Sequence, residues 1–64
     1  MYECRLDQII SWAENSEKAQ RMNFNAITFI GIKENYEQYS KFTNKQEQAI
    51  DNVYFKFNID KWSG

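Results

Sequence analysis

Apolar positions recur at helical spacing in three stretches of the chain. The first stretch covers about residues 2–14, where one stripe with steps of three and four consists of Tyr2, Leu6, Ile9, Ile10 and Ala13. Trp12 lies at the edge of this stripe, and Cys4 lies opposite it. The spacing predicts a helix with one buried face, followed by a short extra turn that Ser16 caps and that ends at Arg21.

The second stretch, about residues 26–40, has apolar side chains on two sides, and Asn25 precedes it as a predicted N-cap. One stripe consists of Ile27, Ile30 and Gly31. The other, about 160° away on a helical wheel, consists of Phe29, Ile32, Tyr36 and Tyr39. Two apolar faces predict a central helix between two others, with Gly31 allowing one neighbour a close approach.

The third stretch, about residues 44–57, has the clearest start. Thr43 and Gln46 match the capping box in which each side chain bonds the other residue's backbone amide. The stripe that follows consists of Ala49, Ile50, Val53, Tyr54 and Phe57. Asn58 is a suitable residue just past the end of this helix, and a tail with Ile59 and Trp62 is predicted to fold back.

These stretches predict an all-α fold, a small three-helix bundle whose second helix is central. The 64 residues form a single domain. Proline is absent and Gly31 is the one internal glycine, so the usual residues of tight β-turns are missing. An α/β fold with strands near residues 26–32 and 53–59 is the alternative, because both segments are rich in β-branched and aromatic residues.

Composition argues against catalysis and against a bound cofactor or metal. The chain has no histidine and one cysteine, which excludes Ser–His and Cys–His pairs and the usual zinc ligand sets within one chain. No glycine-rich phosphate loop is present, so we expect a protein that is not an enzyme and needs no cofactor. A lone cysteine fits a reducing cytoplasm, and the sequence has neither a signal-peptide core nor a membrane-spanning run.

Residues 29–32 and 42–54 carry a resemblance to known sequences. They resemble the pattern F-V-x-S-L, a polar helix, then L-[ST]-x-K-Q-x-x-A-[LI]-x-x-[IV], with Gly31 and Ile32 replacing the usual Ser and Leu. The pattern occurs in small phage proteins and in segments attached to nucleic-acid-handling proteins. The resemblance covers about residues 24–59 and implies a helical hairpin with Thr43 at its corner, a phage context and no catalytic residue.

Aromatic residues make up 17% of the chain, and some fit no buried stripe. Phe55, Trp62 and Trp12 are the predicted anchors of a partner-binding surface, with Lys56, Asp51 and Gln48 as its polar rim. The expected function is non-catalytic binding of a host or phage protein that handles nucleic acid. By occupying the surface of that partner, the chain would modulate or inhibit it. In the alternative arrangement, Trp62 folds over Phe55 and hides both.

Two other functions fit the same residues. Direct binding of single-strand or duplex nucleic acid would use Lys45, Lys41 and Lys61, although the net charge of −1 requires these lysines to gather on one face. Self-association as a homodimer through Phe55 is the third possibility, because a core of this size gains stability from an added interface. No membrane partner is expected.

Overall fold

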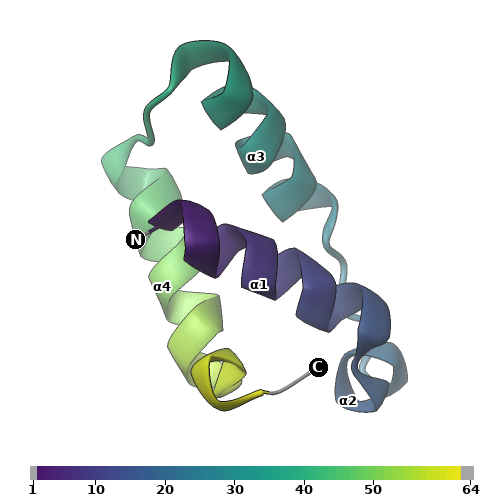
Figure 1. The fold of residues 1–64 in the computed structure, drawn as a ribbon. Coiled ribbons are helices and arrows are strands. Elements are labelled where there is room, and N and C mark those ends of the chain that lie inside the picture. The colour runs from purple at the N-terminus through teal and green to yellow at the C-terminus, as the bar shows by residue number, and fades with distance from the viewer. Residues whose placement is uncertain (1, 63–64) are drawn as a thin grey trace.

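A computed structural model describes residues 2–62, and helices account for its regular structure (Figure 1). No strand occurs within that range. The elements in chain order are α1 (Tyr2–Asn15), α2 (Glu17–Arg21), α3 (Ile27–Tyr39), α4 (Asn44–Lys56) and a 3₁₀ turn, η1 (Ile59–Lys61). The all-α prediction is confirmed, with α2 in the place of the predicted extra turn.

A side-chain cap explains where α4 begins. The Gln46 amide donates to Thr43 Oγ1 at 3.1 Å, and the Thr43 amide donates to Gln46 Oε1 at 2.9 Å. The predicted capping box is therefore present at the start of α4. At α3 the predicted N-cap is wrong by one residue, because Ala26 and not Asn25 occupies that position, and Ala26 has no side-chain oxygen. Asn25 still contributes one bond, since the Ile27 amide donates to its Oδ1 at 2.9 Å and is one of the amides that the first helical turn leaves free.

Three polar residues with positive φ separate the elements. Asn23, Ser40 and Asn58 have φ of 54°, 59° and 53°. Ser40 ends α3, where its amide donates to the Tyr36 carbonyl at 2.6 Å. Asn58 follows α4 as predicted and reverses the chain into η1. Asparagine tolerates this conformation better than most residues, so the chain turns here without glycine.

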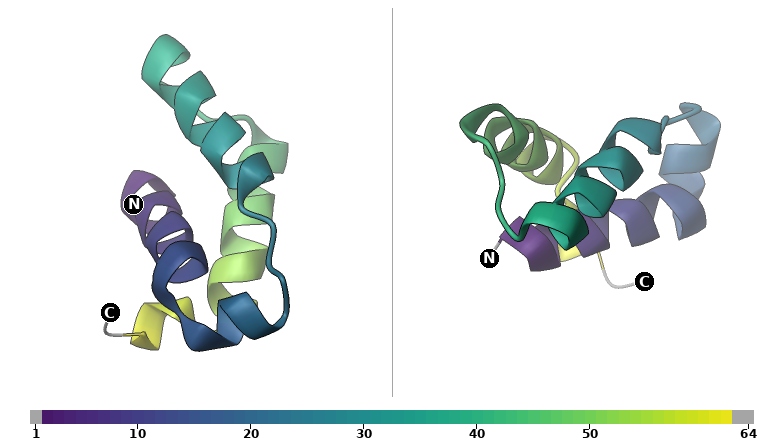
Figure 2. Two further views of the ribbon diagram at one scale, coloured as in Figure 1. Left: turned by 90° about the vertical axis from the view of Figure 1, so that its right-hand side faces the viewer. Right: turned by 90° about the horizontal axis from the view of Figure 1, so that it is seen from above.

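The first helix is the centre of the fold. α3 and α4 diverge from the loop that joins them, and α1 packs against both (Figures 1 and 2). α1 also contacts α2 and η1. The buried apolar core draws on every element and consists of Leu6, Ile9, Trp12, Ala19, Phe29, Ile32, Ile50, Tyr54 and Ile59.

The prediction that the second long helix is central is wrong. α3 packs on α1 through Phe29 and Ile32, while Ile27 and Ile30 remain 73% and 40% exposed. No atom lies within 4 Å of a Cβ built on Gly31, so this glycine admits no close neighbour. Only one of the two apolar stripes is covered, because α4 lies against α1 instead of the outer side of α3.

The α/β alternative is also wrong. Residues 26–32 begin α3, where the Ile30 amide donates to the Ala26 carbonyl at 2.9 Å. Residues 53–59 end α4, where the Phe57 amide donates to the Val53 carbonyl at 3.2 Å. Both segments satisfy their backbone groups locally, and tertiary packing overrides their β propensity. No helix within residues 2–62 is both long enough and apolar enough to cross a bilayer.

Candidate protein-binding surface

Trp12 belongs to the core and is not a surface anchor, contrary to the sequence prediction. Its side chain is 2% exposed. The ring stacks on Phe57 with centroids 5.2 Å apart and meets the edge of Phe24 at 5.0 Å. Phe24 follows α2 and Phe57 follows α4, and the turns there bring both rings to Trp12. Trp12 itself lies at the edge of the apolar stripe of α1. Trp12 is therefore unavailable to a partner.

Phe55 points to solvent, which is one of the two arrangements that the sequence left open. Its side chain is 53% exposed although it lies on α4, which packs against α1. The ring meets Tyr54 edge-on with centroids 5.2 Å apart, and Arg5 Cζ lies 5.4 Å from its centroid. Trp62 is half-buried against the core, and the arrangement in which it hides Phe55 is wrong.

Arg5 organises this surface, and the sequence prediction missed it. Its Nη1 atom donates to Asp51 Oδ1 at 2.6 Å, joining α1 to α4. Its Cζ atom also lies 5.4 Å from the Tyr2 ring centroid and 5.6 Å from that of Tyr54. Tyr2 and Arg5 are three residues apart on one helix, and this spacing is the signal that would have placed them together.

Asp51 is committed to this network and does not serve as a free rim carboxylate. Arg5 occupies one oxygen, and the Tyr2 hydroxyl donates to the other at 3.1 Å. Gln48, Asp51 and Phe55 are spaced by three and four residues, so they share one side of α4. We call the surface formed by Gln48, Asp51, Phe55 and Arg5 the Phe55 face.

An open hollow adjoins the Phe55 face where Arg5 and Tyr2 border both. Its volume is about 570 Å³, and its aromatic wall consists of Tyr2, Tyr36 and Phe42. Tyr36 and Phe42 stack with centroids 4.3 Å apart, and Phe42 meets Tyr2 at 6.2 Å. The surface thus presents a protruding ring beside a recess with aromatic walls.

Lys56, a predicted rim residue, lies away from this face. It is next to Phe55 in sequence, which turns its side chain about 100° around α4. Its Nζ atom lies 5.5 Å from the centroid of the Phe57 ring. The structure therefore separates the six predicted partner-binding residues into the Phe55 face, a buried Trp12, a half-buried Trp62 and Lys56 on another side.

The three lysines predicted to contact nucleic acid do not form one cluster. Lys41, Lys45 and Lys61 are exposed and make no ion pair within the described chain. Lys41 and Lys45 lie at the start of α4, whereas Lys61 follows its other end. The 13 residues of α4 span about 20 Å, so these cations form no continuous track.

Two titratable groups form side-chain pairs that link separate helices. The hydrogen bond from Tyr2 to Asp51 raises the pKa of the tyrosine, with partial burial as the next cause. The hydrogen bond from Lys33 to Asp7 at 2.9 Å raises the pKa of the lysine. Cys4 is free and exposed, and residues 2–62 contain no cluster of three side chains suited to a metal.

Comparison of the chain with protein families, with curated proteins and with solved structures yields no match. The Phe55 face is therefore interpreted from its own geometry.

Proposed function

We propose that the protein is a non-catalytic binding protein that recognises another protein through the Phe55 face. The observation that carries this proposal is the exposed Phe55 ring, held between Tyr54 and the Arg5 guanidinium. An aromatic side chain that is already fixed loses little conformational entropy when a partner covers it. Such rings are typical anchors at the centre of protein interfaces.

The hollow beside Phe55 supports recognition of a protein with its own protruding side chain. Phe55 enters a pocket of the partner, and an apolar side chain of the partner enters the recess formed by Tyr2, Tyr36 and Phe42. Anchors of this kind tend to pair across an interface. The Arg5–Asp51 pair stays intact at the edge, because both groups already have their charge partner.

The resemblance of residues 29–32 and 42–54 to small phage proteins supports a more specific form of the proposal. In that form, the protein acts in the host cytoplasm and binds a host or phage protein that handles nucleic acid. It modulates or inhibits that protein by occupying its surface. In this proposal, occupancy of the surface alone produces the effect.

Affinity capture with matched variants tests the proposal. We would immobilise the wild-type protein, Phe55→Ala and the control Tyr39→Ala, whose side chain is 61% exposed on α3. Each would be incubated with host lysate, with and without nuclease treatment, and bound proteins would be identified by mass spectrometry. We expect one stoichiometric protein with wild type and Tyr39→Ala, and binding weaker by roughly 30-fold with Phe55→Ala.

Two results would contradict the proposal. Capture that disappears after nuclease treatment would assign the surface to nucleic acid, with Lys45 and Lys41 as the next residues to vary. Capture that survives in Phe55→Ala, with unchanged circular dichroism, would place the contact elsewhere. Light scattering at two concentrations would identify self-association, the remaining alternative.

A further inference from the structure

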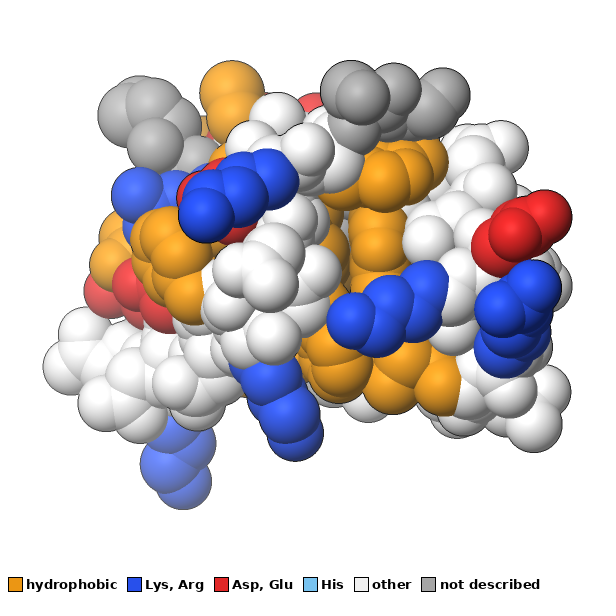
Figure 3. All heavy atoms as spheres, turned by 90° about the horizontal axis from the view of Figure 1, so that it is seen from below, with side chains coloured by type: hydrophobic (Ala, Val, Ile, Leu, Met, Phe, Trp, Pro, Cys, Tyr) orange, Lys and Arg blue, Asp and Glu red, His pale blue; other side chains and the backbone are white. Residues whose placement is uncertain are grey.

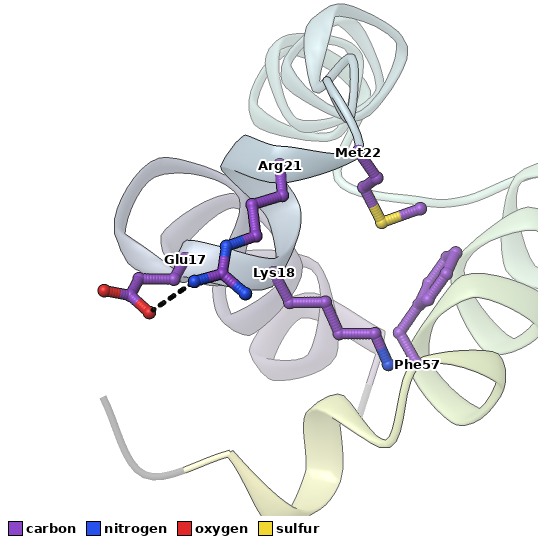
Figure 4. A pocket seen from close by; sticks show the side chains of 5 residues that line it. All are labelled: Glu17, Lys18, Arg21, Met22 and Phe57. Atoms are coloured by element: carbon purple, nitrogen blue, oxygen red, sulfur yellow. Dashed lines mark ion pairs between the residues drawn. The ribbon is translucent and has the colours of Figure 1, made fainter.

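A second surface lies between α2 and the C-terminal end of α4. It is an open groove of about 620 Å³ lined by Glu17, Lys18, Arg21, Met22 and Phe57 (Figure 4). Phe57 is two residues from Phe55, which places the two rings about 200° apart around the axis of α4. The groove is therefore separate from the Phe55 face.

The floor of the groove is apolar, with one fixed and one adaptable side chain. Phe57 is held by its stack on Trp12 and by the edge of Phe24, whose centroid lies 6.0 Å away. Met22 is 43% exposed and points across the groove toward Phe57 (Figure 4). An unbranched thioether adjusts readily to the shape of an incoming apolar side chain.

The rim of the groove carries two basic side chains, Lys18 and Arg21, and one acidic side chain, Glu17. Lys18 reaches from α2 toward Phe57 and makes no ion pair within residues 2–62 (Figure 4). Arg21 contacts Glu17 at 3.7 Å, but both side chains are more than four-fifths exposed, so water screens this pair and leaves the guanidinium available. On the side of the molecule that faces down in Figure 1, Figure 3 shows an apolar strip with blue lysine and arginine side chains across and beside it, and a red acidic side chain next to one of them.

We infer that this groove binds an acidic peptide segment of another protein, with an apolar side chain of that segment against Met22 and Phe57. Carboxylates of the segment pair with Lys18 and Arg21, and the Lys56 ammonium lies close by, 5.5 Å from the Phe57 centroid. We infer a peptide of this kind because its negative charge complements the basic side chains of the rim and its apolar side chain complements the floor of the groove.

The surroundings of Phe57 favour a peptide over a nucleic acid. A base binds such a site by stacking on an open aromatic face. Trp12 stacks on the Phe57 ring, and the Lys56 ammonium lies over it. An aliphatic or aromatic peptide side chain, in contrast, packs against the ring edge and the Met22 thioether without needing a free face.

Fluorescence anisotropy with a defined probe tests this inference. The probe is a short fluorescein-labelled peptide of alternating aspartate and leucine. Comparison peptides carry asparagine for aspartate or serine for leucine, and labelled oligodeoxythymidylate is the nucleic-acid probe. We expect the acidic apolar peptide to bind with a Kd of about 1 mM or tighter, and each comparison peptide to bind about tenfold more weakly.

Matched variants locate the binding site. Lys18→Glu combined with Arg21→Glu reverses two exposed charges and is expected to weaken peptide binding at least about tenfold. The control Lys45→Glu reverses an exposed charge at the far end of α4 and is expected to change it less than about twofold. NMR amide shifts on titration are expected at Lys18, Met22 and Phe57.

Several outcomes would overturn the inference: no peptide binding, equal binding of the neutral peptide, tighter binding of oligodeoxythymidylate, or shifts confined to other residues. Self-association that Lys18→Glu abolishes would assign the groove to a second copy of the chain. Phe55→Ala is expected to leave peptide binding unchanged. These experiments therefore test the groove and the proposed function of the Phe55 face independently, so the failure of one does not decide the other.

Discussion

Arg5 and Asp51 join the first and fourth helices through an ion pair of 2.6 Å across 46 positions of sequence. Their side chains are 32% and 33% exposed, so the pair lies at the boundary between core and surface. The same guanidinium lies against the ring of Phe55. One residue therefore ties the central helix to α4 and supports the exposed ring that we propose as the binding anchor.

Removing this guanidinium is expected to destabilise the fold moderately. We predict that Arg5→Ala lowers the free energy of unfolding by about 1–2 kcal/mol, from the partly screened ion pair and the contacts with aromatic rings. Arg21→Ala is the control, and its 3.7 Å exposed pair predicts a change below about 0.5 kcal/mol. Urea denaturation followed by circular dichroism measures both, and equal effects would contradict a structural role for Arg5.

Trp12 and Phe55 are expected to respond in opposite ways to truncation. Trp12→Ala removes a ring that is 2% exposed and leaves a cavity, at a cost of about 3–5 kcal/mol. Because small domains are only marginally stable, we expect this variant to lose its cooperative thermal transition. Phe55→Ala is expected to change the free energy of unfolding by about 1 kcal/mol or less, since the ring is half exposed. A folded Trp12→Ala variant would contradict the core assignment.

The helices were largely predictable because their signals are local. The capping box at Thr43 and Gln46 and the stripe after it determine α4 within a few neighbouring residues. Asn58 follows the end of that helix for a reason that is equally local, because asparagine tolerates a positive φ. The central place of α1 was not predictable from such signals. Which apolar stripe becomes covered depends on how the helices pack together, and Ile27 and Phe29 are equally apolar in sequence.

The binding surface was predictable only in part, for a related reason. Phe55 was identified because it falls opposite the stripe of its own helix. Trp12 was misplaced because its partners Phe24 and Phe57 come from other elements, which the periodicity of one helix does not reveal. The role of Arg5 rests on Asp51, 46 positions away, and no pattern within α1 specifies that partner.

The capping box at Thr43 predicts a graded series of variants. Thr43→Ala removes the oxygen that accepts from the Gln46 amide and is expected to lower the free energy of unfolding by about 1 kcal/mol. Thr43→Ser keeps that oxygen, so we expect a change within about 0.5 kcal/mol. Urea midpoints of the two variants provide the test. Equal loss in both would point to the threonine methyl group instead of the cap.

Gly31 is expected to be a stabilising site when replaced by alanine. It lies inside α3, where glycine is about 1 kcal/mol less favourable than alanine, and the space around its Cα is open. We predict that Gly31→Ala raises the free energy of unfolding by about 0.5–1 kcal/mol, measured as a shift of the urea midpoint. A decrease would mean that α3 needs a backbone conformation or a close neighbour that this structure does not contain.

The Tyr2–Asp51 hydrogen bond predicts a loss of stability at alkaline pH. This bond raises the pKa of Tyr2 in the folded chain above its ordinary value of about 10. A group with a raised folded pKa stabilises the fold fully below its unfolded pKa, and this contribution is lost as the pH rises through the folded pKa. Ionised Tyr2 no longer donates its proton and is repelled by the Asp51 carboxylate.

Tyr2→Phe separates this effect from that of Lys33, whose pKa is raised by its hydrogen bond to Asp7 and whose contribution is lost over a neighbouring alkaline range. We expect the free energy of unfolding of the wild-type protein to fall as the pH rises above about 10, and to fall less steeply in Tyr2→Phe. Asp7→Asn removes the Lys33 contribution and keeps that of Tyr2. Urea denaturation over this pH range, followed by circular dichroism, measures all three proteins. Identical slopes for the wild type and Tyr2→Phe would show that the Tyr2 hydroxyl does not stabilise the fold through Asp51.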